Sequence, residues 1–379
     1  MPLLPKSDFL LDPTVTFLNH GSFGACPREV FAAYQAWQLE LERQPVLFLG
    51  RRIEGLLRDA MRPLAAYLGA DADDLAFVPN ATAGVNMIAR SLSLEAGDEI
   101  LATEHEYGAC SYGWEEVCKQ TGAIYKQQKI ALPLSTPETF VEQLWQGVTP
   151  RTRVVYISHI SSPTALIFPI EQIVKRAQAE GLITVIDGAH GPAQAAIDLA
   201  KLGADFYTGN CHKWMCAPKG AAFLYAGKPY QAAMQPAFIS WGYHDKRFGE
   251  RLEMQGTRDP AAPLTVPAAL QYIAEHNWPA MQAECHALIE QVWHEMHEIT
   301  GQPPIANPEW FGQMVAVPLP PSTDTDALKT RLYDEYHIEV PVHRWQNIPL
   351  IRVSIQGYNT RTDVERLYTA LSEILADKS

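Results

Sequence analysis

The chain has 379 residues, too many for a single ordinary hydrophobic core, so we expect one large and one smaller domain. Hydrophobic residues make up 47% of it and charged residues 19%, which is typical of globular proteins and excludes wholesale disorder. The formal net charge of −13 argues against nucleic acid or an anionic membrane as a partner.

The N-terminal stretch MPLLPKSDFLLDP carries charges and prolines where a signal peptide needs an unbroken apolar core. No apolar run approaches the roughly 20 residues that span a bilayer. The six cysteines are scattered and form no CxxC pair, which favours reduced thiols over a disulfide framework. These features predict a cytoplasmic protein.

Residues 1–24 are expected to form an extended arm that ends in the turn-rich FLNHGSFG. A helix follows with Pro27 at its first position, and a second helix covers residues 53–68 and stops at Gly69. LAFVPN then reads as a short strand, after which Asn80 can cap a further helix.

Strand and helix signals alternate from this point onward. Strands are predicted at 98–104, 123–129, 154–158, 182–186, 205–209 and 220–227, and helices at 112–121, 137–147 and 170–177. Such alternation indicates an α/β fold in which helices cover both faces of a mostly parallel sheet.

The C-terminal part has a different rhythm. Two amphipathic helices within 263–300 are broken near Asn277, and then come a strand, a helix at 323–336, two strands and a last helix. Val364, Leu367, Leu371 and Ile374 form the apolar stripe of that last helix. We therefore predict an arm at 1–24, a large domain at 25–256 and a small α+β domain at 257–379.

Polar residues follow several predicted strands, and in parallel sheets ligands bind beyond the carboxyl ends of the strands. The helix that begins NATAG offers Thr82 and free backbone N–H groups, a ready site for a phosphate. The strand-end residues are His159, Asp187, Asn210, His212 and Lys213.

An acid and a lysine at neighbouring strand ends suit pyridoxal 5'-phosphate. Asp187 would keep the pyridine nitrogen protonated, so that the ring can accept electrons from the α-carbon of a substrate. Lys213 would hold the cofactor as a Schiff base and later move protons as a general base and acid.

Several motifs resemble those of the class V aminotransferase family of fold type I pyridoxal phosphate enzymes: NATAGVN, EHEYGAC, DGAH, TGNCHKWMCAPKG, QGTRDP and IRVS. The fuller patterns NHGSFGACP and FVPNATAGVN are most similar to its isopenicillin N epimerase-like branch. The resemblance implies a seven-stranded, mostly parallel sheet and action at the α-carbon of an amino-acid-like substrate through an external aldimine.

The resemblance also implies a role for each matching position. His190 replaces the glutamine that usually bonds the phenolic oxygen of the cofactor, and Tyr107 replaces the histidine stacked on its ring. Thr257 would reach the phosphate of a neighbouring subunit in a homodimer with shared active sites. Arg352, with Asn19, would bind the substrate carboxylate. The remaining cofactor contacts would come from Thr82, Ala83 through its backbone, His159, Asn210 and His212.

The reaction stays open between three candidates. We expect epimerisation first, and a carbon–sulfur β-lyase or an aminotransferase as alternatives, with a catalytically silent binding protein less favoured because Asp187 and Lys213 are both present. Desulfurases of this family carry a nucleophilic cysteine in the loop shortly before the Arg-x-Ser strand. The resemblance therefore disfavours persulfide chemistry here, because residues 338–349 contain no cysteine. Cys211, His212 and Cys216 lack the spacing of a zinc site, so no metal is predicted.

Overall fold

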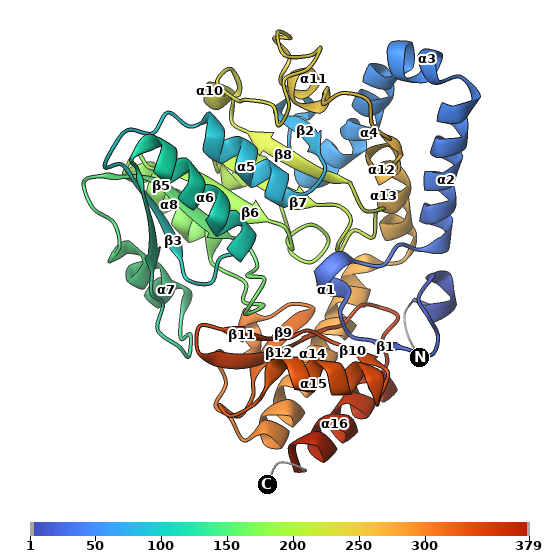
Figure 1. Cartoon of the computed structure of the whole chain (residues 1–379), viewed down its shortest axis with the longest axis vertical. Helices are drawn as coiled ribbons and strands as arrows, with labels where there is room; N and C mark the ends of the chain where they lie inside the picture. The colour runs from blue at the N-terminus through green and yellow to red at the C-terminus, as the bar shows by residue number, and fades with distance from the viewer. Residues whose placement is uncertain (1–3, 377–379) are drawn as a thin grey trace.

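The computed structural model describes residues 4–376, and its centre is a seven-stranded sheet (Figure 1). The strand order is β2-β8-β7-β6-β5-β3-β4, and all strands run parallel to one another except β8, which is antiparallel to both of its neighbours. This confirms the predicted α/β class and the mostly parallel sheet. The strands are β2 Leu75–Val78, β3 Glu99–Thr103, β4 Ile124–Gln128, β5 Thr152–Ser158, β6 Ile183–Gly188, β7 Phe206–Asn210 and β8 Ala222–Ala226.

Helices cover both faces of this sheet because its strands are apolar on both sides. In β2, Ala76 and Val78 pack with α5 and α6, whereas Leu75 and Phe77 point into the opposite cluster with α4 and α8. The helices around the sheet are α2 Arg28–Arg43, α3 Pro45–Leu47, α4 Ile53–Leu68, α5 Ala81–Ser91, α6 Gly108–Thr121, α7 Pro137–Trp145, α8 Ile170–Ala179, α9 Leu199–Leu202, α10 Lys228–Gln231, α11 Phe248–Glu253, α12 Ala261–Leu264 and α13 Val266–Glu275.

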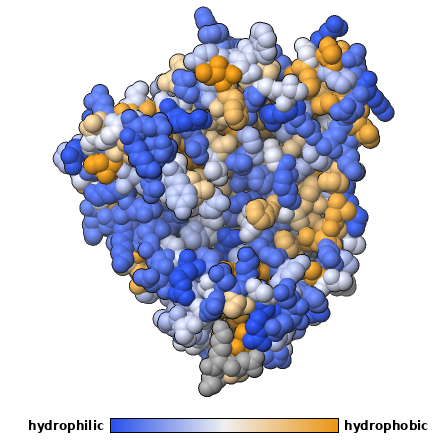
Figure 2. Space-filling view, viewed as in Figure 1, coloured by the Kyte–Doolittle hydropathy of each residue, from blue (hydrophilic) through white to orange (hydrophobic). Residues whose placement is uncertain are grey.

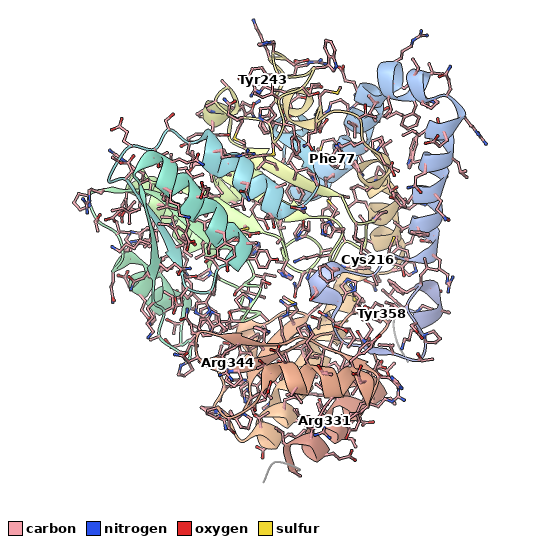
Figure 3. All side chains as sticks on the ribbon, viewed as in Figure 1. Phe77, Cys216, Tyr243, Arg331, Arg344 and Tyr358 are labelled. Carbon is pink, nitrogen blue, oxygen red and sulfur yellow. The ribbon has the colours of Figure 1, made fainter. Side chains whose placement is uncertain are left out.

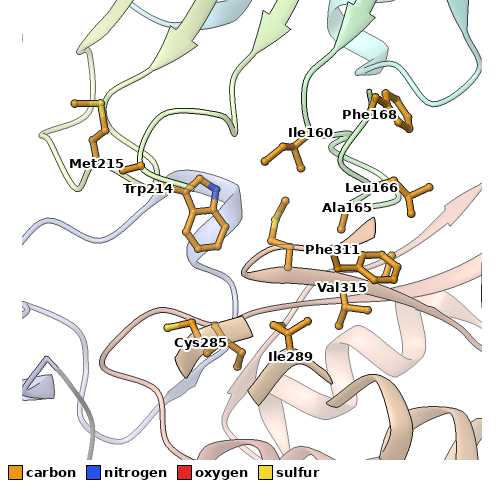
Figure 4. Close-up of a cluster of buried hydrophobic side chains, with 14 of the residues drawn as sticks. Ile160, Ala165, Leu166, Phe168, Trp214, Met215, Cys285, Ile289, Phe311 and Val315 are labelled. Atoms are coloured by element: carbon orange, nitrogen blue, oxygen red, sulfur yellow. The ribbon is translucent and has the colours of Figure 1, made fainter. Parts of the chain in front are cut away.

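A three-stranded antiparallel sheet with three helices forms what we call the C-terminal unit. Figure 4 shows Ile289 of α14 and Val315 of β9 in the same buried cluster as Ile160 and Trp214, which follow β5 and β7. The unit therefore lies against the carboxyl ends of the main strands. Its elements are β9 Met314–Pro318, β11 Val342–Trp345, β12 Ile348–Ser354, α14 Trp278–Thr300, α15 Thr325–Asp334 and α16 Arg361–Ala376.

The N-terminal arm differs from the extended form that the sequence suggested. Strand β1 (Thr16–Phe17) pairs in parallel with β10 (Ile338–Glu339), and α1 (His20–Phe23) follows it. Pairing with β10 satisfies backbone groups that a free arm would leave to water, so the arm is fixed to the C-terminal unit.

Two further boundaries differ by a few residues. α6 begins at Gly108 instead of Tyr112, and Pro27 caps α2 rather than opening it. The predicted domain limits remain a prediction. Within residues 4–376, no helix has the length and apolar character needed to cross a membrane.

The contact between α5 and β7 gives a stability test. A Cβ at Gly84 would lie 2.8 Å from Thr208 Cβ, which is too close for α5 to keep its present packing against β7. Gly84→Ala should lower the free energy of unfolding by about 1–3 kcal/mol in urea titrations. Gly55→Ala is the control, since Gly55 lies exposed in α4 with open space around it. That change should raise stability by about 0.5–1 kcal/mol, and equal effects of the two changes would contradict the close packing.

Candidate active site

A cavity of about 420 Å³ opens at the carboxyl ends of β5, β6 and β7, on the side of the C-terminal unit. Main-sheet loops, α1 and β12 all contribute to its wall. Eight residues predicted from the sequence line it: Thr82, Tyr107, Asp187, His190, Asn210, His212, Lys213 and Arg352.

Lys213 follows β7, and its amine points into the cavity. Burial, and after it the charge of the Arg352 guanidinium, lower its pKa from 10.5 to about 7, against the opposing effect of Asp187. A large share of this amine is therefore unprotonated near neutral pH. Such an amine is a nucleophile and a proton acceptor.

His190 presents an N–H group to this amine. Trp214 Nε1 donates to His190 Nδ1 at 3.2 Å, so the proton of the neutral imidazole is on Nε2, which lies 3.1 Å from Lys213 Nζ. Burial holds the pKa of His190 well below its usual range, and the charges of Lys213 and Arg352 lower it further. His190 is thus a neutral hydrogen-bond donor, as a glutamine side chain would be.

Asp187 stands at the end of β6 as a fully buried acid. Its Oδ1 accepts the Ala189 N–H at 3.0 Å, and its Oδ2 accepts from Tyr156 at 3.3 Å and from Cys110 Sγ at 3.6 Å. Burial raises the pKa of Asp187, and these donors and the Lys213 charge lower it. The carboxylate is held rigidly and has one side toward the cavity.

The N-terminus of α5 forms another wall of the cavity. Asn80 caps the helix as predicted, by accepting the Ala83 N–H at 2.8 Å, and Asn210 accepts the Ala81 N–H at 2.8 Å. His212 Nδ1 lies 3.0 Å from the Ala221 carbonyl oxygen and therefore donates to it. The positive end of a helix dipole and an imidazole thus meet at one place, which suits an anion.

Arg352 lies on β12 and is 5% exposed. Its Nη1 donates to the carbonyl and hydroxyl oxygens of Ser162, and its Nη2 donates to the Ser22 hydroxyl at 3.0 Å. Its buried Nε has no hydrogen-bond partner within residues 4–376, and no carboxylate there pairs with it. Burial lowers its pKa to about 10. A buried cation without a counter-ion in the wall of a cavity matches a carboxylate ligand.

Four predicted site residues do not line this cavity. The Ala83 N–H is already taken by Asn80, and His159 lies behind the wall with Nδ1 2.9 Å from the Tyr207 hydroxyl. Asn19 also lies behind the wall, where it accepts from Ser22. Thr257 lines a separate cavity of about 490 Å³ next to Trp241.

The sequence did not single out several residues that the structure adds to the wall. Ser22, Phe23, Ser158, Ser162 and Lys219 all line the cavity. Ser22 and Phe23 lie in the four-residue helix α1, and Ser162 and Lys219 lie in turns, so no periodic pattern marks a buried face there. Ser158 could have been predicted, because it is the last residue of β5, pairs in register with Asp187, and ligands bind at the carboxyl ends of parallel strands.

This set of groups fits pyridoxal 5'-phosphate. A rigid buried acid, a neutral imidazole donor and a low-pKa amine surround a cavity whose far walls offer an anion site and an unpaired guanidinium. Together with the sheet, they define a fold type I enzyme.

Comparison with known proteins gives the family. The model for aminotransferase class-V matches residues 26–367, so the chain belongs to this pyridoxal-phosphate-dependent family and is an enzyme of epimerase, lyase or transferase type. It is 37% identical to the isopenicillin N epimerase of Amycolatopsis lactamdurans over 96% of both chains. A probable chloroplastic L-cysteine desulfhydrase of Arabidopsis thaliana is 27% identical over 97% of this chain and 84% of its own.

The solved structures agree on the fold. The cysteine desulfurase from Thermococcus onnurineus NA1 superimposes with a TM-score of 0.85 at 20% identity, over 98% of this chain and 97% of that one. The predictions of family, fold type and cofactor are confirmed.

The depressed pKa of Lys213 predicts how the cofactor-free protein takes up pyridoxal phosphate. The neutral amine reacts, so the rate of colour formation should rise with pH around a midpoint near 7 instead of 10.5. Arg352→Gln removes a repelling positive charge and should move that midpoint to higher pH. Stopped-flow absorbance measures both values. A midpoint above 9 in the unmodified protein would contradict the buried environment.

Proposed function

We propose that this chain is an epimerase-like enzyme that removes and returns the α-proton of an amino acid or a short peptide-like amine. The observation that carries this proposal is the 37% identity to an isopenicillin N epimerase along nearly the whole of both chains. The cavity supports it, because a neutral amine and an unpaired guanidinium face the same space.

We assign the cofactor end of the cavity to five side chains. Thr82 and His212 hold the phosphate at the N-terminus of α5, with Asn210 fixing that helix start. Asp187 faces the pyridine nitrogen, and the Nε2–H of His190 donates to the phenolic oxygen. Pyridoxal phosphate, when bound, supplies an electron sink for the charge that develops at the α-carbon.

The substrate end is assigned to Arg352, Tyr107 and Lys213. Arg352 fixes the α-carboxylate. This contact sets how the C–H bond of the α-carbon is oriented relative to the electron sink. Lys213 Nζ accepts the α-proton on one face. Tyr107, which is 45% exposed and lines the cavity, is the hydroxyl we assign to the opposite face.

A β-eliminating carbon–sulfur lyase is the second candidate. The observation that favours it is the likeness to L-cysteine desulfhydrases over almost the whole chain. Elimination would use the same lysine to remove the α-proton and would then lose sulfide from the β-carbon. The Tyr107 hydroxyl would not be required for this reaction.

Incubation in deuterium oxide separates these candidates. If the enzyme is an epimerase, the wild-type protein should invert the α-carbon of its substrate, incorporate deuterium there and release no keto acid. NMR would measure the deuterium and the keto acid, and chiral chromatography would measure the inversion. Tyr107→Phe should slow epimerisation by about 100-fold while α-exchange from one enantiomer persists. Lys213→Ala should abolish both processes.

Three other outcomes would overturn parts of this proposal. Release of pyruvate with ammonia and sulfide would establish the lyase. A keto acid with an aminated cofactor would establish a transferase. Borohydride fixation of the cofactor at a residue other than Lys213 would refute the assignment of the lysine.

We further propose a homodimer in which Thr257 of one subunit reaches the phosphate site of the other. Thr257 lies apart from the main cavity, beside an exposed apolar surface that includes Phe238, Ile239 and Trp241, which is 96% exposed. Figure 2 shows apolar side chains gathered at the top and upper right of this face, over α3 and the segment before α11. The six free cysteines fit a reducing compartment such as the cytoplasm.

Subunit mixing tests the shared sites. Lys213→Ala and Thr257→Ala homodimers should both be impaired. A hybrid of the two should regain one intact site, because the Thr257→Ala subunit keeps its lysine and receives a normal Thr257 from its companion. Activity should therefore rise on mixing after mild unfolding and refolding. No gain, or a monomeric mass in sedimentation equilibrium, would refute the arrangement.

A further inference from the structure

The segment NHGSFG, residues 19–24, lies where the lysine loop meets the C-terminal unit. Figure 1 shows α1 between the main sheet and that unit. Gly24 has φ +69°, and a Cβ there would lie 2.7 Å from the Lys213 carbonyl oxygen and 2.9 Å from Lys213 Cα. The segment thus packs directly on the backbone of Lys213, and a side chain at position 24 would separate the two.

His20 makes the polar contact to this backbone. Its Nε2 lies 3.1 Å from the Lys213 carbonyl oxygen, and because a carbonyl can only accept, Nε2 carries the proton. Gln356 Nε2 is farther from the same nitrogen, at 3.3 Å, and Cys216 Sγ lies at 3.9 Å. The ring is fully buried, and this burial lowers its pKa to about 3, so it stays neutral.

Tyr358 fixes the other side of the imidazole. Its hydroxyl lies 2.9 Å from His20 Nδ1, which in this tautomer accepts the hydroxyl proton. Figure 3 shows Cys216 and Tyr358 beside α1, with Cys216 above Tyr358 in this view. A continuous path of hydrogen bonds therefore runs from Tyr358, which follows β12, through His20 to the carbonyl of Lys213.

The same short helix also holds the arginine. Ser22 accepts from Arg352 Nη2 at 3.0 Å and donates to Asn19 Oδ1, while Asn19 Nδ2 donates to Glu339 at 2.8 Å. Met314 and Ser354 leave no space for a side chain at position 21, so α1 cannot shift toward β9 or β12. One rigid element thus contacts the backbone of the lysine and the side chain of the arginine.

We propose that His20 is a positioning residue for Lys213, and that α1 fixes the distance between the amine and the Arg352 guanidinium. The inference rests on the proposed function in one respect, namely that Lys213 is the reacting amine. Since rates depend steeply on the geometry of reacting groups, a small loosening of the lysine backbone is expected to cost activity.

Tyr358→Phe is the most direct test, because it removes the hydroxyl that fixes His20 and keeps the ring. The rate of pyridoxal phosphate uptake by the cofactor-free variant should fall about 10-fold at pH 7. The pH midpoint of uptake should also move upward from about 7, because a loosened amine gains hydration. A purely structural role for Tyr358 would lower the unfolding temperature without moving this midpoint.

Tyr272→Phe is the matched control. Tyr272 lies in the same aromatic cluster around Phe9, and its buried hydroxyl has no partner within residues 4–376. Its uptake rate and midpoint should equal those of the unmodified protein. The pair compares one buried hydroxyl that holds His20 with one that holds nothing.

Replacement of His20 itself gives a second, independent comparison. His20→Ala should show the full defect, whereas His20→Gln retains a side-chain N–H for the Lys213 carbonyl and should recover much of the rate. Identical behaviour of Tyr358→Phe and Tyr272→Phe, or of His20→Ala and wild type, overturns the proposal. Failure of the proposed function looks different: borohydride would then fix the cofactor elsewhere in every variant, wild type included.

Discussion

The side chains of Lys213 and Arg352 face one cavity, and the electrostatic repulsion between them governs the rest of the site. Arg352 is buried and Lys213 is half-buried, and their repulsion is part of the reason that the pKa of the amine falls to about 7. Such an arrangement is costly unless one cation gives up its proton or an anion arrives. Near neutral pH a large share of the lysine is therefore an unprotonated, nucleophilic amine, while the arginine stays charged and can bind a carboxylate.

Two buried acids stand near the strand ends of this site, Asp187 in the wall of the cavity and Glu106 outside it. Asp187 is held by Tyr156, Cys110 and the backbone, and Glu106 accepts hydrogen bonds from Thr103 and Ser158 one strand away. Burial, and to a lesser extent the charge of Asp187, raise the pKa of Glu106 to about 7, although these hydrogen bonds lower it. Asp187 thus presents a carboxyl group at the end of β6, apart from the anion site at the N-terminus of α5. This separation would orient a cofactor that has a cationic ring nitrogen and an anionic phosphate.

Much of this site was predictable from the sequence because it depends on strand ends. Asp187, Asn210 and Lys213 follow apolar runs that the sheet aligns at one edge, and Asn80 marks the start of α5 by ordinary capping chemistry. The rest depends on side chains from distant segments. Ser22 in the short helix α1 and Ser162 in a loop reach Arg352 from segments that have no periodic signal, and the proton position on His190 is set by Trp214. No local pattern records such contacts.

The same distinction explains why the cofactor follows from the fold while the reaction does not. The acid, the lysine and the helix N-terminus are fixed by the sheet, and each of the three candidate reactions would use them. The choice between epimerisation and elimination depends on groups at the cavity mouth, where Tyr107 precedes α6 and Phe23 ends α1. Both aromatic rings are largely exposed in the free chain. We therefore expect the choice of reaction to depend on these two exposed side chains, one of which is carried by α1, the helix that also contacts the backbone of Lys213.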